Sequence, residues 1–130
     1  MHKVLFIGLG TMGFHIAGHL SKSNNVTVYN RTTSKSREWV NKYDGSFIEK
    51  LSEIKDKPNF VVSCIGNDDD LVDITTSEKG CFNYLSKNSI FIDHSTVSPQ
   101  VVKSTESEAS KRSIHFLDAP ISGGEVGAIN

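Results

Sequence analysis

The chain has 130 residues, the usual size of one domain, with 37% hydrophobic and 22% charged residues. Its formal net charge of -1, with no block of Lys and Arg, argues against nucleic acid or a membrane surface as the main partner. No apolar run approaches the ~20 residues of a membrane span, and the amino-terminal residues lack a signal-peptide cleavage pattern, so we expect a cytoplasmic protein.

Segments typical of strands and helices alternate along the chain. Short apolar runs predict strands at residues 3–7, 26–29, 47–48, 59–63, 89–93 and 114–118. Helical spacing and capping residues predict helices at 11–21, 32–43, 49–55, 68–75 and 98–111, the last two capped by Asp68 and by Ser98 before Pro99. Strands separated by helices predict an α/β domain with a parallel sheet and right-handed crossovers.

A glycine-rich turn, residues 8–13, directly follows the first strand and reads Gly-Leu-Gly-Thr-Met-Gly. This G-x-G-x-x-G spacing, between a strand and a helix, is the context of the dinucleotide-binding fingerprint in a Rossmann-type, doubly wound sheet. Gly8 permits the tight turn, Gly10 lets the backbone approach the pyrophosphate, and Gly13 lets the helix pack against the strand. The alternative is a glycine loop without a ligand. The residues of this turn predicted to bind the cofactor are Gly8, Leu9, Gly10, Thr11, Met12 and Gly13.

The end of the second strand bears on the choice of cofactor. NAD sites usually carry an Asp or Glu there to bind the ribose 2′-hydroxyl. This chain instead has Asn30, Arg31 and Thr32. No acid repels a 2′-phosphate, and Arg31 offers charge-assisted hydrogen bonds to one. We therefore predict a preference for NADP over NAD; the alternative is that Arg31 is a solvated surface charge.

Three further loops follow strands and carry polar groups or glycine. Cys64, Ile65 and Gly66 follow the fourth strand, at the sheet edge where ligands of doubly wound folds bind, so we expect them beside ribose or nicotinamide. The acidic run 68–70 is compatible with a metal, but helix capping is favoured because no His or Cys lies nearby at metal-ligand spacing. We predict no metal site, and we expect the two cysteines to be free thiols.

His94 follows the fifth strand and is either a general acid or an ordinary loop histidine, the second being favoured. A Ser-His-Asp hydrolase is excluded because adjacent residues of the run 93–95 point in opposite directions and the G-x-S-x-G elbow is absent. Near the end of the chain, Ser122, Gly123 and Gly124 form either an anion-binding nest or a plain turn.

Four segments, taken together and in this order, resemble the β-hydroxyacid dehydrogenase family, which includes 3-hydroxyisobutyrate dehydrogenases and glyoxylate or tartronate-semialdehyde reductases. The resemblance covers essentially the whole chain. The 6-phosphogluconate dehydrogenases are a weaker match because they show a Gly-Gly-Asn type sequence where this chain has residues 94–96. The four segments are residues 8–13, 29–32, 93–96 with Pro99, and 118–124 with Gly127-Ala128.

The resemblance implies roles for particular residues. Thr96 would lie by the nicotinamide, and Ser122, Gly123 and Gly124 would bind the carboxylate of a small-molecule substrate. The implied reaction is hydride transfer between the nicotinamide and a hydroxyacid or aldehyde-acid of the 3-hydroxyisobutyrate, glyoxylate, tartronate semialdehyde or succinic semialdehyde type. In that scheme a lysine beyond Asn130 is the general acid or base, so no catalytic residue is expected within this chain.

The chain ends at Asn130, just after the glycine-rich turn, so we expect residues 1–130 to be a Rossmann domain truncated near its carboxyl end. The resemblance places a helical second domain, which builds a homo-oligomer, after that point. We predict that the 130-residue chain binds cofactor but does not catalyse alone. The alternatives are a non-catalytic NADP-binding module, or an enzyme like 6-phosphogluconate dehydrogenase or an imine reductase.

Overall fold

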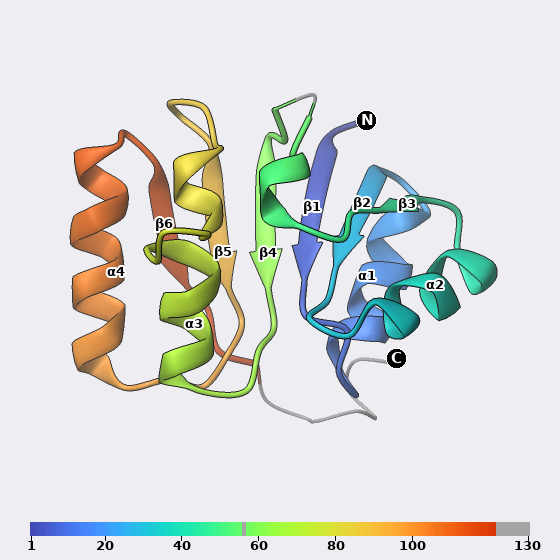
Figure 1. Cartoon of the computed structure of the whole chain (residues 1–130), viewed down its shortest axis with the longest axis horizontal. Helices are drawn as coiled ribbons and strands as arrows, with labels where there is room; N and C mark the ends of the chain where they lie inside the picture. Colours follow the sequence, from blue (N-terminus) through green and yellow to red (C-terminus); the bar gives the residue numbers. More distant parts are fainter. Residues whose placement is uncertain (56, 122–130) are drawn as a thin grey trace.

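A computed structural model of the chain describes residues 1–55 and 57–121. Within these residues, six parallel strands form one sheet in the spatial order β3-β2-β1-β4-β5-β6 (Figure 1). The strands are β1 Lys3–Ile7, β2 Asn25–Tyr29, β3 Ser46–Phe47, β4 Phe60–Ser63, β5 Ile90–Asp93 and β6 His115–Asp118. This order is that of the Rossmann fold, which confirms the predicted doubly wound parallel sheet.

Helices cover both faces of the sheet. One face packs against α1 (Gly13–Ser21) and α2 (Thr33–Lys42) through a core that includes Phe6, Val28 and Trp39. The other face packs against α3 (Asp68–Thr75), α4 (Pro99–Lys111) and the 3-10 turns η1 (Leu51–Glu53) and η2 (Cys81–Asn83). Figure 1 shows α3 and α4 in front of the sheet and α1 behind it. Successive side chains of β1 enter opposite cores, which explains its unbroken apolar sequence.

The structure corrects several predicted element boundaries. Helix α1 begins at Gly13 rather than at residue 11. The two residues before it form a turn, which the bond from the Phe14 amide to the Gly10 carbonyl closes. The cap of α3 is Asn67, whose side chain accepts from the Asp70 amide, and Asp68 is instead the first helical residue. The predicted short helix at 49–55 is only the 3-10 turn η1.

Helix α4 begins as predicted. The Ser98 side chain accepts from the Val101 amide, and Pro99 stands at the first helical position. Both cysteines are free thiols, as expected. Among the described residues, no helix has both the length and the apolar character needed to cross a bilayer.

Candidate functional site

A cavity of about 430 Å³ lies at the carboxyl ends of β1, β2 and β4. Strand β1 is the point where the strand order reverses, since β2 lies on one side of it and β4 on the other. Ligands of doubly wound folds bind at such a switch point. The cavity is lined by Ile7, Gly8, Gly10, Thr11, Met12, Gly13, Tyr29, Asn30, Arg31, Thr32, Cys64, Ile65, Gly66, Asp70, Asp73 and Ile74.

The three glycines of the turn meet three different steric demands. Gly8 has a φ of +103°, and a Cβ there would overlap the carbonyl oxygen of Cys64. A Cβ at Gly13 would overlap the carbonyl oxygen of Gly8, so this glycine brings the first turn of α1 against the loop. A Cβ at Gly10 meets no protein atom within 4 Å, because Gly10 is exposed and lines the cavity. The open space at Gly10, beside the start of α1, fits the phosphates of a dinucleotide.

Hydrogen bonds tie this turn to the end of β2. The Gly8 amide donates to the Tyr29 carbonyl at 2.9 Å, and the Leu9 amide donates to Asn30 Oδ1 at 2.9 Å. The Asn30 side-chain amide also donates to the Thr32 carbonyl at 3.1 Å. Asn30 therefore braces the turn, in addition to lining the cavity. Leu9 lies in the core beneath the turn at 1% exposure, so a contact with phosphate would have to use its backbone.

Charged groups gather at the β2 end of the cavity. The Arg31 guanidinium forms an ion pair with the Asp70 carboxylate, which comes from the first turn of α3. Asp73, one turn further along α3, lines the same cavity. Burial, and then the nearby charge of Asp73, raise the pKa of Tyr29. One cation and two carboxylates therefore border the part of the cavity where an adenosine ribose is expected.

A buried carboxylate connects the loops that follow β4 and β5. Asp93 Oδ1 accepts from the Ser63 hydroxyl at 2.8 Å and from the Ser95 amide at 3.1 Å. The Ser95 hydroxyl in turn accepts from the Ile65 amide at 2.8 Å. Among the described residues, Asp93 Oδ2 has no hydrogen-bond partner. This network positions Ile65 at the cavity wall, and no motif in the sequence indicates it.

The Asp93→Asn variant is expected to lose a pH dependence of stability. Burial raises the pKa of the Asp93 carboxyl above 3.8, although hydrogen bonds from Ser95 and Ser63 oppose the shift. The native state therefore holds a proton that the unfolded state has lost, and stability falls as the pH rises from about 4 through the native pKa. For one proton this slope is at most about 1.4 kcal/mol per pH unit.

Denaturant unfolding of both proteins between pH 4 and pH 8 measures this difference. The asparagine keeps Oδ1 as an acceptor, so the network is retained while the ionisation is removed. Other carboxylates, such as Asp68 and Glu108, titrate equally in both proteins and cancel in the comparison. If the free energy of unfolding depends on pH in the same way in the two proteins, Asp93 does not titrate as its burial implies.

His94 and Thr96 lie outside the cavity lining. The His94 Nδ1 lies 2.7 Å from the Ala119 carbonyl oxygen, which can only accept, so the ring donates to the end of β6. This contact supports the reading of His94 as a loop histidine. Thr96 lines a separate, open hollow together with Gly66 and Asp69, next to the main cavity. Its contact with the nicotinamide stays a prediction.

Among residues 1–55 and 57–121, no three His, Cys, Asp or Glu side chains cluster as they would around a metal ion. The acidic run 68–70 forms the first turn of α3 instead. Ser122, Gly123 and Gly124, the predicted carboxylate-binding residues, lie outside the described residues.

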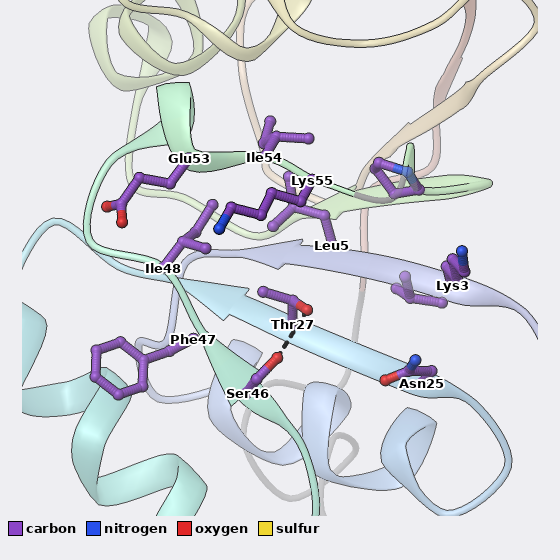
Figure 2. Close-up of a pocket in the computed structure, with 12 residues that line it drawn as sticks. Lys3, Leu5, Asn25, Thr27, Ser46, Phe47, Ile48, Glu53, Ile54 and Lys55 are labelled. Carbon is purple, nitrogen blue, oxygen red and sulfur yellow. Dashed lines mark hydrogen bonds between the residues drawn. The ribbon is translucent and has the colours of Figure 1, made fainter.

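A second cavity, of about 320 Å³, lies at the other end of the sheet. Figure 2 shows Lys3 and Asn25 from the first residues of β1 and β2, with Ile48 and Ile54 from the segment between β3 and β4. The side-chain hydroxyls of Thr27 and Ser46, which also line this cavity, form a hydrogen bond with an oxygen–oxygen distance of 2.9 Å. This cavity contains no glycine turn and lies away from the carboxyl ends of β1, β2 and β4, so the first cavity is the better candidate for a nucleotide site.

Most of the residues predicted to bind cofactor thus meet at one cavity, although their contacts with a cofactor stay predictions. Tyr29, Asp70, Asp73 and Ile74 also line it, and no sequence pattern predicts that any of them contacts the cofactor. For Asp70, the acidic run 68–70 was the one signal in the sequence. That this run lies near Arg31 could not be predicted, because it depends on the order of the strands in the sheet.

The comparisons with known proteins agree with this architecture. A family model described as the NAD binding domain of 6-phosphogluconate dehydrogenase matches residues 3–130. An uncharacterized oxidoreductase of Shewanella frigidimarina is 43% identical over 131 aligned positions, covering 100% of this chain and 45% of that protein. The mitochondrial 3-hydroxyisobutyrate dehydrogenase of Drosophila melanogaster is 32% identical, covering 95% of this chain and 37% of that protein. The chain therefore spans less than half the length of these relatives.

Solved structures share the fold. The 3-hydroxyisobutyrate dehydrogenase of Mycobacterium tuberculosis superposes with a TM-score of 0.85 at 20% identity, over 99% of this chain and 43% of that one. The protein Psf3, solved with NADP+ and 2-OPP, superposes with a TM-score of 0.89 at 24% identity, over 97% of this chain and 45% of that one. The chain belongs to the family of NAD-binding domains described for 6-phosphogluconate dehydrogenase, and its relatives are oxidoreductases like 3-hydroxyisobutyrate dehydrogenase.

Proposed function

We propose that this chain is the NADP-binding part of an oxidoreductase that transfers hydride between nicotinamide and a small hydroxyacid or aldehyde-acid. The observation that carries the cofactor choice is Arg31, which lines the cavity just after β2, where the sequence offers no acid. A 2′-phosphate there would receive charge-assisted hydrogen bonds from the guanidinium. The related fold of Psf3, which was solved with NADP+, supports the proposal.

The described residues have binding and orienting roles in this proposal. Gly10 and the first turn of α1 receive the phosphates through backbone N–H groups and the positive end of the helix dipole. Asn30 holds the glycine turn in place from the neighbouring strand. Ile65 and Cys64 form the wall towards the ribose and nicotinamide. The bound cofactor would supply the hydride, and these residues bind and orient the cofactor.

The substrate side of the proposal lies outside the described residues. Ser122, Gly123 and Gly124 bind the substrate carboxylate, and a lysine beyond Asn130 transfers the proton. The similarity to the 3-hydroxyisobutyrate dehydrogenase of Drosophila melanogaster, of which the chain covers 37%, supports this class of substrate. The 130-residue chain is accordingly expected to bind NADPH without measurable turnover of hydroxyacids.

The Arg31→Gln variant tests the cofactor choice. We expect the unaltered chain to bind NADPH more tightly than NADH, and the variant to lose about 10- to 100-fold in NADPH affinity, since hydrogen bonds to charged groups contribute ~1.5–3 kcal/mol. Its NADH affinity is expected to change little. Titration followed by nicotinamide fluorescence measures all four dissociation constants.

Arg37→Gln is the matched control. Arg37 lies on α2, forms an exposed ion pair with Glu49 and is absent from the cavity lining, so the same change there should leave both affinities unchanged. Tighter binding of NADH than of NADPH by the unaltered chain would refute the proposed cofactor choice.

A further inference from the structure

We propose that Asp70 competes internally for Arg31, so that the Asp70 carboxylate limits how strongly this site prefers NADP(H) over NAD(H). The inference rests on the proposed function only in that the cavity binds the adenosine end of a nicotinamide dinucleotide. It assigns a specificity-determining role to a residue of α3. This residue is far in sequence from the end of β2, where residues usually determine the preference for NAD(H) or NADP(H).

The contact that carries this inference is the ion pair between Arg31 and Asp70. The two residues are 39 positions apart in the chain, yet both line the cavity. The carboxylate therefore occupies one terminal nitrogen of the guanidinium, a donor that a 2′-phosphate at Arg31 would also use. A phosphate at Arg31 must either displace Asp70 or share the guanidinium with it.

The two partners differ in how firmly they are held. The Asp70 side chain is 25% exposed, and its backbone amide is bonded at 2.9 Å to the Asn67 cap of α3. The Arg31 side chain is 71% exposed. The Asp70 carboxylate is thus partly buried on a backbone that the cap holds, whereas Arg31 is a long, mostly exposed side chain that reaches it from the end of β2. The pair holds the guanidinium towards α3 when no phosphate is present.

The balance of charge in the cavity points the same way. Its charged lining residues are Arg31, Asp70 and Asp73, which together carry a net charge of -1. A 2′-phosphate brings further negative charge, so each carboxylate opposes it, whereas the uncharged 2′-hydroxyl of NAD(H) feels no such repulsion. Removing the charge of Asp70 frees Arg31 and also removes one repulsive interaction, and both effects favour NADP(H).

The test is the Asp70→Asn variant, with dissociation constants for NADPH and NADH measured by fluorescence titration. We expect the ratio of the NADH constant to the NADPH constant to rise about tenfold, the effect of ~1.4 kcal/mol of charge interaction. Far-UV circular dichroism checks the fold, which should be retained because Asn67, rather than the Asp70 side chain, caps α3. A ratio that stays the same or falls overturns the proposal; a fall would mean that Asp70 orients Arg31 for the phosphate.

Asp69→Asn is the matched control. Asp69 carries the same charge in the same helical turn but lines the neighbouring hollow with Thr96, and we expect its ratio to stay unchanged. An equal rise in this control would assign the effect to helix charge in general and overturn the proposal. In the Arg31→Gln background, Asp70→Asn should raise the ratio less than it does in the unaltered chain, because the competition requires the guanidinium and only the removed repulsion remains.

These outcomes separate the inference from the proposed function. If the unaltered chain prefers NADH but Asp70→Asn raises the ratio, the proposed cofactor choice fails and the role of Asp70 stands. If the unaltered chain prefers NADPH and Asp70→Asn leaves the ratio unchanged, the reverse holds. If neither the unaltered chain nor any variant binds NADPH or NADH, both the proposed function and the role of Asp70 are overturned.

Discussion

Alanine at Gly8 is expected to destabilise the fold by about 3 kcal/mol or more, whereas alanine at Gly10 should leave stability almost unchanged and weaken cofactor binding. At Gly8 the new Cβ meets the Cys64 carbonyl, and the φ of +103° is one that alanine adopts only under strain. Domains of this size are stable by only ~5–15 kcal/mol, so the loss is a large fraction of the total.

At Gly10 the same methyl group enters open space, because no protein atom lies within 4 Å. Its backbone is outside the left-handed region, so alanine introduces no strain there. The methyl group instead projects where the backbone is expected to approach the pyrophosphate. We expect at least a tenfold weaker NADPH affinity from the lost close approach.

Denaturant unfolding followed by far-UV circular dichroism measures the first effect, and NADPH titration measures the second. Each variant is the control for the other, since both add one methyl group to the same turn. If Gly10→Ala binds NADPH as well as the unaltered chain does, the cavity beside Gly10 is not where the phosphates lie.

Truncating Trp39 to alanine is expected to have the other large effect, a loss of about 3–5 kcal/mol in the free energy of unfolding. Trp39 lies on the buried face of α2 at 0% exposure, and its ring centroid lies 5.5 Å from that of Tyr43. Tyr43 in turn packs so closely on Gly18 of α1 that a Cβ at Gly18 would overlap its ring. Trp39 therefore supports, through Tyr43, the helix whose first turn faces the cavity.

Trp39→Phe is the matched control, since it keeps an aromatic ring and removes the indole N–H, which has no hydrogen-bond partner among the described residues. We expect the phenylalanine variant to lose less than half as much stability as the alanine variant. Denaturant unfolding of both variants measures the difference. A loss below about 1 kcal/mol for alanine would show that the surrounding core collapses to fill the space.

The class of fold and the glycine turn could both be predicted from local sequence patterns. Strand β1 was recognisable because it is apolar on both faces, and the turn because its steric demands act between neighbouring residues. The start of α4 was equally local, since Ser98 and Pro99 act within one helical turn. Errors arose where a local signal was ambiguous, as between Asn67 and Asp68 at the start of α3.

The composition of the site was decided by the tertiary structure. The sequence indicated that Arg31 would follow β2, but not that Asp70 would meet it, because that contact depends on β4 pairing with β1 and on the placing of α3. The bond from Leu9 to Asn30 and the network at Asp93 likewise join different strand ends. Periodicity and capping report each residue's own conformation and burial, whereas strand order and crossovers decide which side chains meet across the chain.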